Sequence, residues 1–318
     1  MMARSFPIGL GARQRGLTIV EILVALLVSL ILIAGVIQIF VGTRQTYRFQ
    51  DALARVQENG RFAVATIGRD LRLAGFVGCT TLVSVAPNAV PPLAVNYSRD
   101  TYISGLAPAG LGQAPGTDVV TLRMLEPGMM RLSVDMPNPP NLVTVEANTQ
   151  GLQVGDVAAV ADCNNVDLFT VNTVGGGAGA ITVEPNDALR VAYVAGAELG
   201  RYREVTYYIA DGASGQRALW RRDDGVDAEL IDGVEDLWMR YGEDLDNDGA
   251  PDAYVAAAAV IDWSRVRSVR FSLLLASAED NVTGGPQPVN FRGAALVPAD
   301  GRYRQVLTST VGLRNRLP

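Results

Sequence analysis

The chain has 318 residues, of which 48% are hydrophobic, and its 33 glycines and 16 prolines favour a turn-rich, β-rich body over a helical bundle. All 27 basic residues are arginine and histidine is absent, which excludes Ser-His-Asp catalysis, Cys-His pairs and metal sites built on imidazole. The net charge of −6 and the isoelectric point near 4.9 argue against a general nucleic-acid-binding protein, because such proteins are normally basic.

The N-terminus combines a basic stretch with a long apolar run. Residues 1–16 carry three arginines and no acid, and residues 17–42 contain a single ionisable group, Glu21. The arginines are Arg4, Arg13 and Arg15. At a rise of about 1.5 Å per residue, the apolar run is long enough to cross a hydrocarbon core of about 30 Å. Basic residues before the run predict that the N-terminus stays in the cytoplasm and that the acidic body is translocated.

A plain membrane anchor explains this segment except for Glu21. A carboxylate at the centre of a membrane helix costs about 2.5 kcal/mol or more, and ionisable residues there usually serve a function. The alternative is a carboxylate near the helix start that extends towards the membrane interface. The segment also differs from an ordinary secretory signal, because no clear small-x-small cleavage site follows the apolar run.

Gly16, the following Leu-Thr-Ile-Val-Glu and the continuous apolar helix resemble the class III signal of type IV pilins and type II secretion pseudopilins. The resemblance implies that a prepilin peptidase cuts between Gly16 and Leu17 and methylates the new terminal amine. Many family members have phenylalanine where this chain has Leu17. Glu21 corresponds to the family's glutamate, whose carboxylate would face a positive terminal amine on a neighbouring subunit. Two opposite charges in a low-dielectric medium attract strongly, so the pair would favour the assembled state.

Apolar residues continue along the chain at spacings of three, four or seven, which predicts an amphipathic helix that ends near Gly75. These residues are Leu53, Val56, Ala63, Ile67 and Leu71. Gly60 and Gly68 are expected to weaken the helix locally. The predicted organisation is a leader peptide over residues 1–16, a long helix over 17–75 and a β-rich domain over 76–318. Within the helix, residues 17–42 would be transmembrane and residues 43–75 amphipathic.

The end of this helix narrows the resemblance to the PilW branch of type IV pilus assembly proteins, which are minor pilins. That branch has a similar Arg-x-Ala-Gly-aromatic-x-Gly-Cys pattern, and here it runs from Arg72 to Cys79. Three further stretches fit the branch, namely residues 154–171, 266–277 and 303–316. The resemblance therefore covers both ends of the chain and much of the middle.

Cys79 and Cys163 are the two cysteines of the chain. A translocated body lies in an oxidising compartment, so a disulfide that ties the helix end to a β-rich region is expected. Two buried free thiols or an intermolecular bond are the alternatives.

The region after Cys79 predicts strands separated by turns, with a long surface loop over residues 86–117. Together with the long helix, this gives an α+β fold in which one or two mainly antiparallel sheets pack on the helix, as in pilins. The strand order stays open. The predicted strands span 118–125, 141–147, 156–162, 167–174, 180–185, 204–210, 218–222 and 266–277.

The stretch GEDLDNDGAPDAY over residues 242–254 matches the first part of an EF-hand-like calcium loop. Such loops place oxygen ligands at alternate positions and a turning glycine at position six. The candidate calcium ligands are the side chains of Asp244, Asp246, Asp248 and Asp252 and the backbone carbonyl of Ala250.

A complete EF-hand is excluded, because Val255 occupies the position of the bidentate glutamate. Glu243, Asp262 or water would have to complete the coordination shell. The alternative is a solvated acidic turn, in which Asp-Gly and Asn-Asp are common.

We expect a structural protein and not an enzyme, since a nucleophilic serine has no histidine base. Asp223 and Asp224, or the acidic cluster at residues 244–252, could be considered for glycoside chemistry, yet these acids stand in hydrophilic, turn-like stretches. A DNA-uptake role would need a basic patch, for which Arg221-Arg222 and the pair Arg302 and Arg304 are sparse candidates.

The resemblance implies a minor pilin that primes or caps a type IV pilus together with other minor pilins. Its expected partners are the prepilin peptidase, other minor pilins, the assembly machinery and inner-membrane lipid. It would lie in the inner membrane with its body in the periplasm, and later in the pilus. The alternatives are a type II secretion minor pseudopilin and a pilus-tip module for DNA uptake or adhesion. No cofactor is required, and Ca²⁺ is a candidate ligand.

Overall fold

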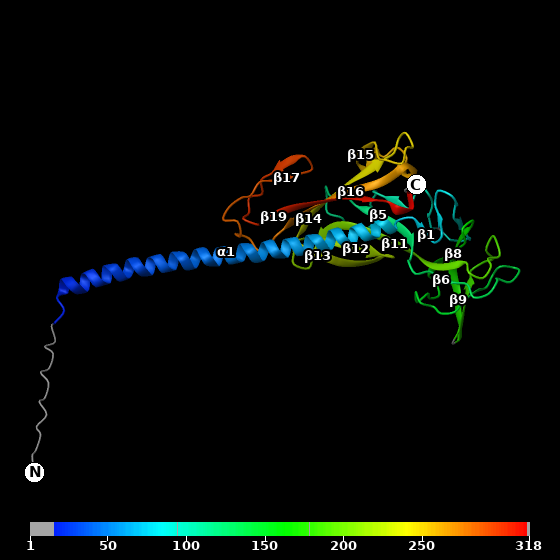
Figure 1. The fold of residues 1–318 in the computed structure, drawn as a ribbon, viewed down its shortest axis with the longest axis horizontal. Helices are drawn as coiled ribbons and strands as arrows, with labels where there is room; N and C mark the ends of the chain where they lie inside the picture. The colour runs from blue at the N-terminus through cyan, green and yellow to red at the C-terminus, as the bar shows by residue number, and fades with distance from the viewer. Residues whose placement is uncertain (1–15, 94, 178, 317–318) are drawn as a thin grey trace, which may run out of the picture. The chain divides into compact units, whose positions relative to one another are not determined.

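The computed structural model describes residues 16–93, 95–177 and 179–316 (Figure 1). The predicted leader up to position 15, with Arg4, Arg13 and Arg15, lies outside the described residues. The chain separates into two compact units, Met1–Asp51 and Ala52–Pro318, each of which is described by itself.

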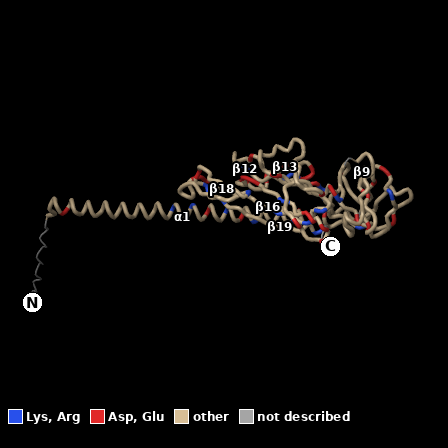
Figure 2. The backbone as a smooth tube through the Cα atoms, turned by 90° about the horizontal axis from the view of Figure 1, so that it is seen from above, with Lys and Arg blue, Asp and Glu red and all other residues tan. Residues whose placement is uncertain are grey.

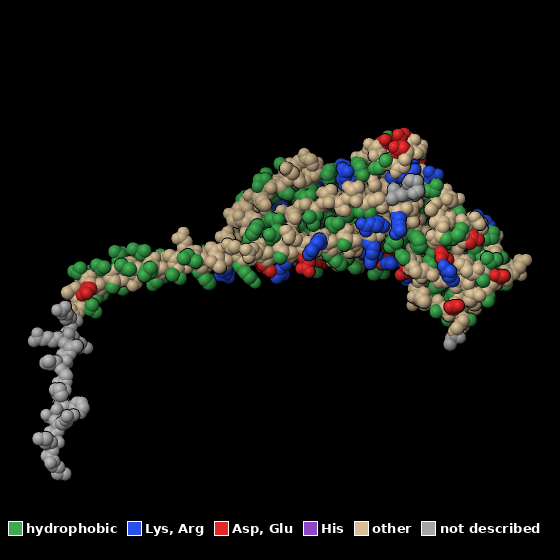
Figure 3. All heavy atoms as spheres, viewed as in Figure 1, with side chains coloured by type: hydrophobic (Ala, Val, Ile, Leu, Met, Phe, Trp, Pro, Cys, Tyr) green, Lys and Arg blue, Asp and Glu red, His purple; other side chains and the backbone are tan. Residues whose placement is uncertain are grey.

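The first unit contains the N-terminal part of helix α1 (Ile19–Leu73). Between Glu21 and Arg44 the helix has no charged residue, and its large apolar side chains are exposed. Figure 3 shows these side chains covering the N-terminal part of the helix. By length and apolar composition, α1 meets the requirements for a membrane-spanning helix.

In the second unit, α1 buries one face from Ala52 onwards. Its buried apolar residues, including Val56, Ile67 and Leu71, belong to the same core as residues of the β-strands. A Cβ atom at Gly60 would collide with the end of the Leu307 side chain, so glycine leaves room for that leucine against the helix. The glycine that the sequence predicts to weaken the helix therefore serves its packing.

Among the described residues, eleven strands form the larger sheet, and its main path runs β13-β12-β11-β8-β9-β10-β7. The described pairings are antiparallel except for the short parallel pair of β3 with β9. The strands are β3 (Asn88–Ala89), β4 (Ile103–Ser104), β5 (Val120–Leu125), β6 (Met130–Arg131), β7 (Val143–Val145), β8 (Val157–Ala161), β9 (Val166–Gly177), β10 (Ala180–Pro185), β11 (Glu198–Asp211), β12 (Arg217–Asp223) and β13 (Val226–Asp232).

A second, antiparallel sheet has the order β15-β14-β16-β19 within the described chain. Its strands are β14 (Val234–Glu243), β15 (Ala253–Val255), β16 (Val266–Ala276) and β19 (Arg304–Gly312). Two short hairpins are β1 (Phe76–Val77) with β2 (Thr80–Thr81), and β17 (Val289–Phe291) with β18 (Ala294–Leu296). The short 3₁₀ helices are η1 (Ala257–Ala259), η2 (Trp263–Arg265) and η3 (Arg314–Arg316). The fold is therefore α+β and mainly antiparallel, as the sequence predicts.

Strand β11 contributes to both of the larger apolar cores in the described chain. Its residues Val205 and Tyr207 belong to the core that includes α1 and β16. Its residue Leu199 belongs to a second core with Phe169 and Val143 of β9 and β7. The N-terminal half of β11 pairs with β6 and β8, and the C-terminal half pairs with β5 and β12.

Candidate functional site

The segment around the predicted cleavage bond lies at the start of α1. Gly16 and Leu17 are exposed and precede the first helical residue, Ile19. The amide of Glu21 donates to Oγ1 of Thr18 at 3.2 Å, and the amide of Thr18 donates to a carboxylate oxygen of Glu21 at 3.5 Å. This reciprocal pair is a capping box, in which two amide groups that lack partners in the first helical turn are satisfied.

The capping box gives Glu21 a local role that the sequence interpretation missed. The Thr-x-x-Glu spacing in front of an apolar run is its sequence signal. Because Glu21 is exposed and its bond to the Thr18 amide is long, the carboxylate remains accessible for a second partner.

A disulfide joins Cys79 and Cys163, whose Cα atoms are 5.3 Å apart and which are separated by 84 positions in the sequence. Cys79 lies between β1 and β2, directly after the end of α1, and Cys163 lies between β8 and β9. The bond therefore ties the turn after the helix to the β8–β9 hairpin.

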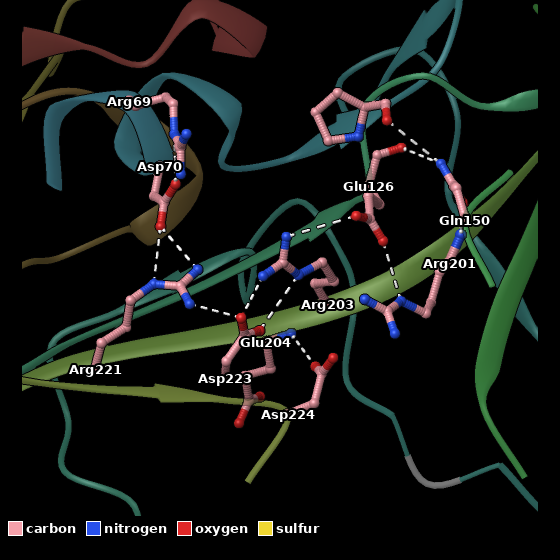
Figure 4. Close-up of polar contacts among 11 residues, drawn as sticks. Arg69, Asp70, Glu126, Gln150, Arg201, Arg203, Glu204, Arg221, Asp223 and Asp224 are labelled. Atoms are coloured by element: carbon pink, nitrogen blue, oxygen red, sulfur yellow. Dashed lines mark hydrogen bonds and ion pairs between the residues drawn. The ribbon is translucent and has the colours of Figure 1, made fainter. Parts of the chain in front are cut away.

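Asp70 is a buried carboxylate on the face of α1 that packs on the larger sheet. The hydroxyl of Tyr207 on β11 donates to its Oδ2 at 2.7 Å, and Nη2 of Arg221 on β12 donates to the same oxygen at 3.2 Å (Figure 4). Burial raises the pKa of Tyr207, and the neighbouring carboxylate raises it further, so the phenol stays protonated as the donor. These bonds attach the helix to two neighbouring strands.

The polar network continues from Arg221 across the sheet (Figure 4). Nη1 of Arg221 donates to Asp223 at 2.6 Å, and Arg203 forms a second ion pair with the same carboxylate. Arg203 and Arg201 both pair with Glu126, at 3.8 Å and 3.1 Å. Acidic and basic groups thus alternate from α1 to the end of β5, and their charges offset one another.

The two acids considered for catalysis are held in this network. Burial alone would raise the pKa of Asp223, but hydrogen bonds from Arg203 and Arg221 outweigh it and lower the pKa. Burial raises the pKa of Asp224, whose Oδ1 accepts the amide of Glu204 at 2.8 Å. Since the Asp223 carboxylate is shared by two guanidinium groups, it is poorly suited to act as a base or nucleophile.

A cleft of about 510 Å³ borders the network and is lined by residues that include Arg123, Arg201 and Glu204. Arg123 and Glu204 form an ion pair at 2.7 Å, and Arg201 pairs with Glu126. These charges already have partners within the chain.

The arginines considered for nucleic-acid binding are also paired with acids or amides. Arg222 forms a two-point ion pair with Asp227, and Arg304 forms two-point pairs with Glu235 and Asp300. The hydrogen bonds from Arg304 lower the pKa of Asp300 to about 2. Nη1 of Arg302 donates to Gln216. Acidic and basic residues are both spread over the second unit (Figure 2). Since each of these arginines is held by an acid or an amide, they do not form a free basic patch.

The structure brings together three of the predicted calcium ligands. Oxygen atoms of Asp244, Asp246 and Asp252 lie within 4.8 Å of one another. Asp248 lies outside this group, and its Oδ1 accepts the amide of Ala250 at 2.8 Å.

The two acids that the sequence offers as additional ligands have other partners. Both carboxylate oxygens of Glu243 accept backbone amides of residues 261 and 262. Asp262 caps η2 by accepting the amide of Ser264 and pairs with Arg265 at 3.5 Å. Of the three additional ligands that the sequence offers for a calcium ion, water is therefore the one that remains.

Comparisons with known proteins found matches for the N-terminal segment and for the C-terminal part of the β-rich body. The family model described as Type IV Pilus-assembly protein W matches residues 206–315, which run from β11 to η3. The model of the prokaryotic N-terminal methylation motif matches residues 11–37, which include Gly16, Leu17 and Glu21. Neither the comparison with curated proteins nor the comparison with solved structures found a match. The methylation motif at the N-terminus and the pilus-assembly family match in the β-rich body support a type IV pilus minor pilin-like protein.

Proposed function

We propose that the chain is made as a precursor, held in the inner membrane by residues 17–42, and cut between Gly16 and Leu17 by a prepilin peptidase. The new terminal amine on Leu17 is methylated. Residues 43–75 then continue as the amphipathic half of the helix, and residues 76–318 form the body on the periplasmic side. The processed protein joins other minor pilins in a complex that primes or caps a type IV pilus.

One observation carries this proposal, namely that the methylation motif and the pilus-assembly family match occur on the same chain. The match to a pilus-assembly family favours a pilus over a type II secretion system. The paired charges around Asp70 and Asp223 support a structural role, because they connect the helix to the sheet. The arginine pairing described above also favours assembly over DNA uptake.

The intact mass of the protein, purified from membranes of cells with and without a prepilin peptidase, tests the proposal. We expect a mass that lacks residues 1–16 and carries one additional methyl group, and we expect it only when the peptidase is present. An unprocessed chain in both strains would overturn the proposed cleavage and leave a plain membrane anchor.

Glu21→Gln separates the two roles of Glu21. Glutamine at this position can keep the capping box with Thr18, but it removes the negative charge. We expect normal processing and helix formation, with incorporation into pili reduced at least about tenfold because the terminal amine of a neighbour loses its partner. Immunoblots of sheared pili and of membranes measure this ratio.

Thr18→Ala is the matched control for this variant. It removes a hydroxyl from the capping box and keeps the charge of Glu21. We expect incorporation close to that of the wild type. Normal incorporation of Glu21→Gln, or an equal loss in both variants, would show that the charge is not what assembly requires.

A further inference from the structure

The loop between β14 and β15 is closed at both ends by the antiparallel sheet. Glu243 is directly opposite Ala253 in the register of these strands, and the amide of Asp252 donates to the carbonyl of Glu243 at 2.9 Å. The amide of Asp244 donates to the carbonyl of Arg265 at 3.0 Å. The first and last carboxylates of the loop are therefore held on fixed backbone.

Backbone amides inside the loop orient its acidic side chains. Oδ2 of Asp252 accepts the amide of Leu245 at 2.7 Å, and Oδ1 of Asp246 accepts the amide of Asp248 at 3.1 Å. Gly249 has a φ of +91°, a conformation that favours glycine, and its amide donates to Oδ2 of Asp244 at 3.1 Å. The loop thus turns back towards Asp244.

This arrangement concentrates negative charge at one point. The oxygens of Asp244, Asp246 and Asp252 lie within 4.8 Å of one another. Nε of Arg267 donates to Asp244 at 2.8 Å and offsets one of the three charges. Two like charges remain uncompensated by this arginine, a number that suits a divalent cation.

Asp244 supplies a second and independent observation. Its side chain is fully buried, with 0% of its surface exposed. Oδ2 accepts from Arg267 and Gly249, whereas the buried Oδ1 has no hydrogen-bond partner. A buried carboxylate oxygen without a partner is costly and is rare in folded proteins. A bound cation would satisfy it.

The chemistry of the donors selects the cation. The donors are carboxylate oxygens, which hard cations prefer, and the chain has no histidine and no free cysteine to hold zinc. Ca²⁺ binds oxygens at about 2.3–2.6 Å, so two of its ligands can be up to about 5 Å apart. Mg²⁺ requires shorter bonds of about 2.0–2.1 Å in near-ideal octahedral geometry. Three oxygens that lie within 4.8 Å of one another can all reach one Ca²⁺ ion.

We infer that the β14–β15 loop is a calcium site formed by the carboxylates of Asp244, Asp246 and Asp252. The carbonyl of Ala250 and water complete its shell of oxygen ligands. Its affinity falls in the range of about 10⁻⁴–10⁻³ M that is typical of extracellular modules. This inference concerns the body alone and does not depend on processing or assembly.

Calcium chloride titrated into the full-length protein in detergent micelles, after treatment with EDTA, tests the inference. We expect 10 mM Ca²⁺ to raise the thermal midpoint of the body by about 3–10 °C, as expected for a ligand at ten to a hundred times its dissociation constant. Tb³⁺ provides a direct readout, because the carbonyl of Arg265 at the end of η2 accepts the amide of Asp244 and places Trp263 in the adjoining turn. Ca²⁺ should displace Tb³⁺ and quench the emission sensitised by tryptophan.

Asp246→Asn is the informative variant, because Asp246 is exposed and asparagine can still accept the amide of Asp248. We expect it to fold and to bind Ca²⁺ at least about tenfold more weakly. Asp187→Asn removes the same charge at an exposed position that lies outside the loop, and it should bind Ca²⁺ like the wild type.

Three results would overturn the site. They are no shift at 10 mM Ca²⁺, an equal shift with Mg²⁺ or with sodium chloride of the same ionic strength, and an undiminished shift in Asp246→Asn. An equal shift with sodium chloride would indicate simple screening of the charges in the acidic loop.

Discussion

Replacement of Asp70 by alanine is expected to lower the free energy of unfolding by about 2–4 kcal/mol, the largest effect of any single side chain in the polar network. The variant leaves the buried hydroxyl of Tyr207 without its acceptor and removes one of the two carboxylates that hold Arg221. Breaking a buried ion pair by removing one partner typically costs about 3–5 kcal/mol. Asp223 still pairs with Arg221, which places the expected loss towards the lower part of that range.

Urea unfolding of the full-length protein in detergent micelles, followed by tryptophan fluorescence, measures this loss. Arg69→Ala is the matched control, because the Arg69 side chain is 70% exposed although it too contacts Asp70. We expect its effect to stay within about 0.5 kcal/mol. Asp70→Asn should fall between the two, since it keeps an acceptor for Tyr207 and loses the charge. A loss below about 1 kcal/mol in Asp70→Ala would contradict the proposed attachment of the helix.

Removal of the disulfide by the double substitution Cys79→Ala and Cys163→Ala is expected to destabilise the body by about 4 kcal/mol. The bond closes a loop that spans 84 positions, and the chain-entropy model assigns a loop of that length a stabilisation of about 4.5 kcal/mol, of which real bonds often deliver somewhat less. The effect acts mainly through the unfolded state, which becomes less restricted. Urea unfolding under oxidising conditions measures it.

Reduction with dithiothreitol provides the control for the disulfide. It should lower the stability of the wild type by a similar amount and leave the double variant unchanged. An equal response of both proteins to the reductant, or a loss below about 1 kcal/mol in the variant, would contradict a stabilising bond between these cysteines.

The elements with simple local patterns are predictable from the sequence. The long helix is expected over residues 17–75 and is observed as Ile19–Leu73, because a continuous apolar run and then an amphipathic stripe are both local signals. The stretch at 266–277 is expected to be a strand and is β16. The neighbouring predicted strands at 204–210 and 218–222 are observed as β11 and β12, which pair antiparallel.

Strands β13 and β14 are missing from the sequence interpretation, because acids interrupt both of them. Two of these acids have arginine partners: Asp227 pairs with Arg222 across the β12–β13 hairpin, and Asp236 pairs with Arg292, which is 56 positions away. Such pairs make a charged strand compatible with a sheet, and the partner of Asp236 is brought to it only by the tertiary fold. A local pattern cannot report that partner.

The residues of the candidate site also divide into those with a local sequence pattern and those whose role depends on distant partners. The Gly16, Leu17 and Glu21 segment and the acidic loop are short motifs, so their residues can be named from the sequence. The role of Asp70 cannot be predicted from the sequence, since its partners Tyr207 and Arg221 are 137 and 151 positions away. The orphan oxygen of Asp244 likewise depends on how residues from η2 and β16 surround it, which no spacing rule encodes.

Strand β11 has a consequence for how the body unfolds. Its two halves contribute side chains to different apolar cores. Opening either core would therefore disturb the β11 backbone on which the other core is built. The amides of β11 should therefore exchange with solvent deuterium only through global unfolding, at the slowest rates in the chain. The two cores then form a single cooperative unit, and damage to either one lowers the protection of both.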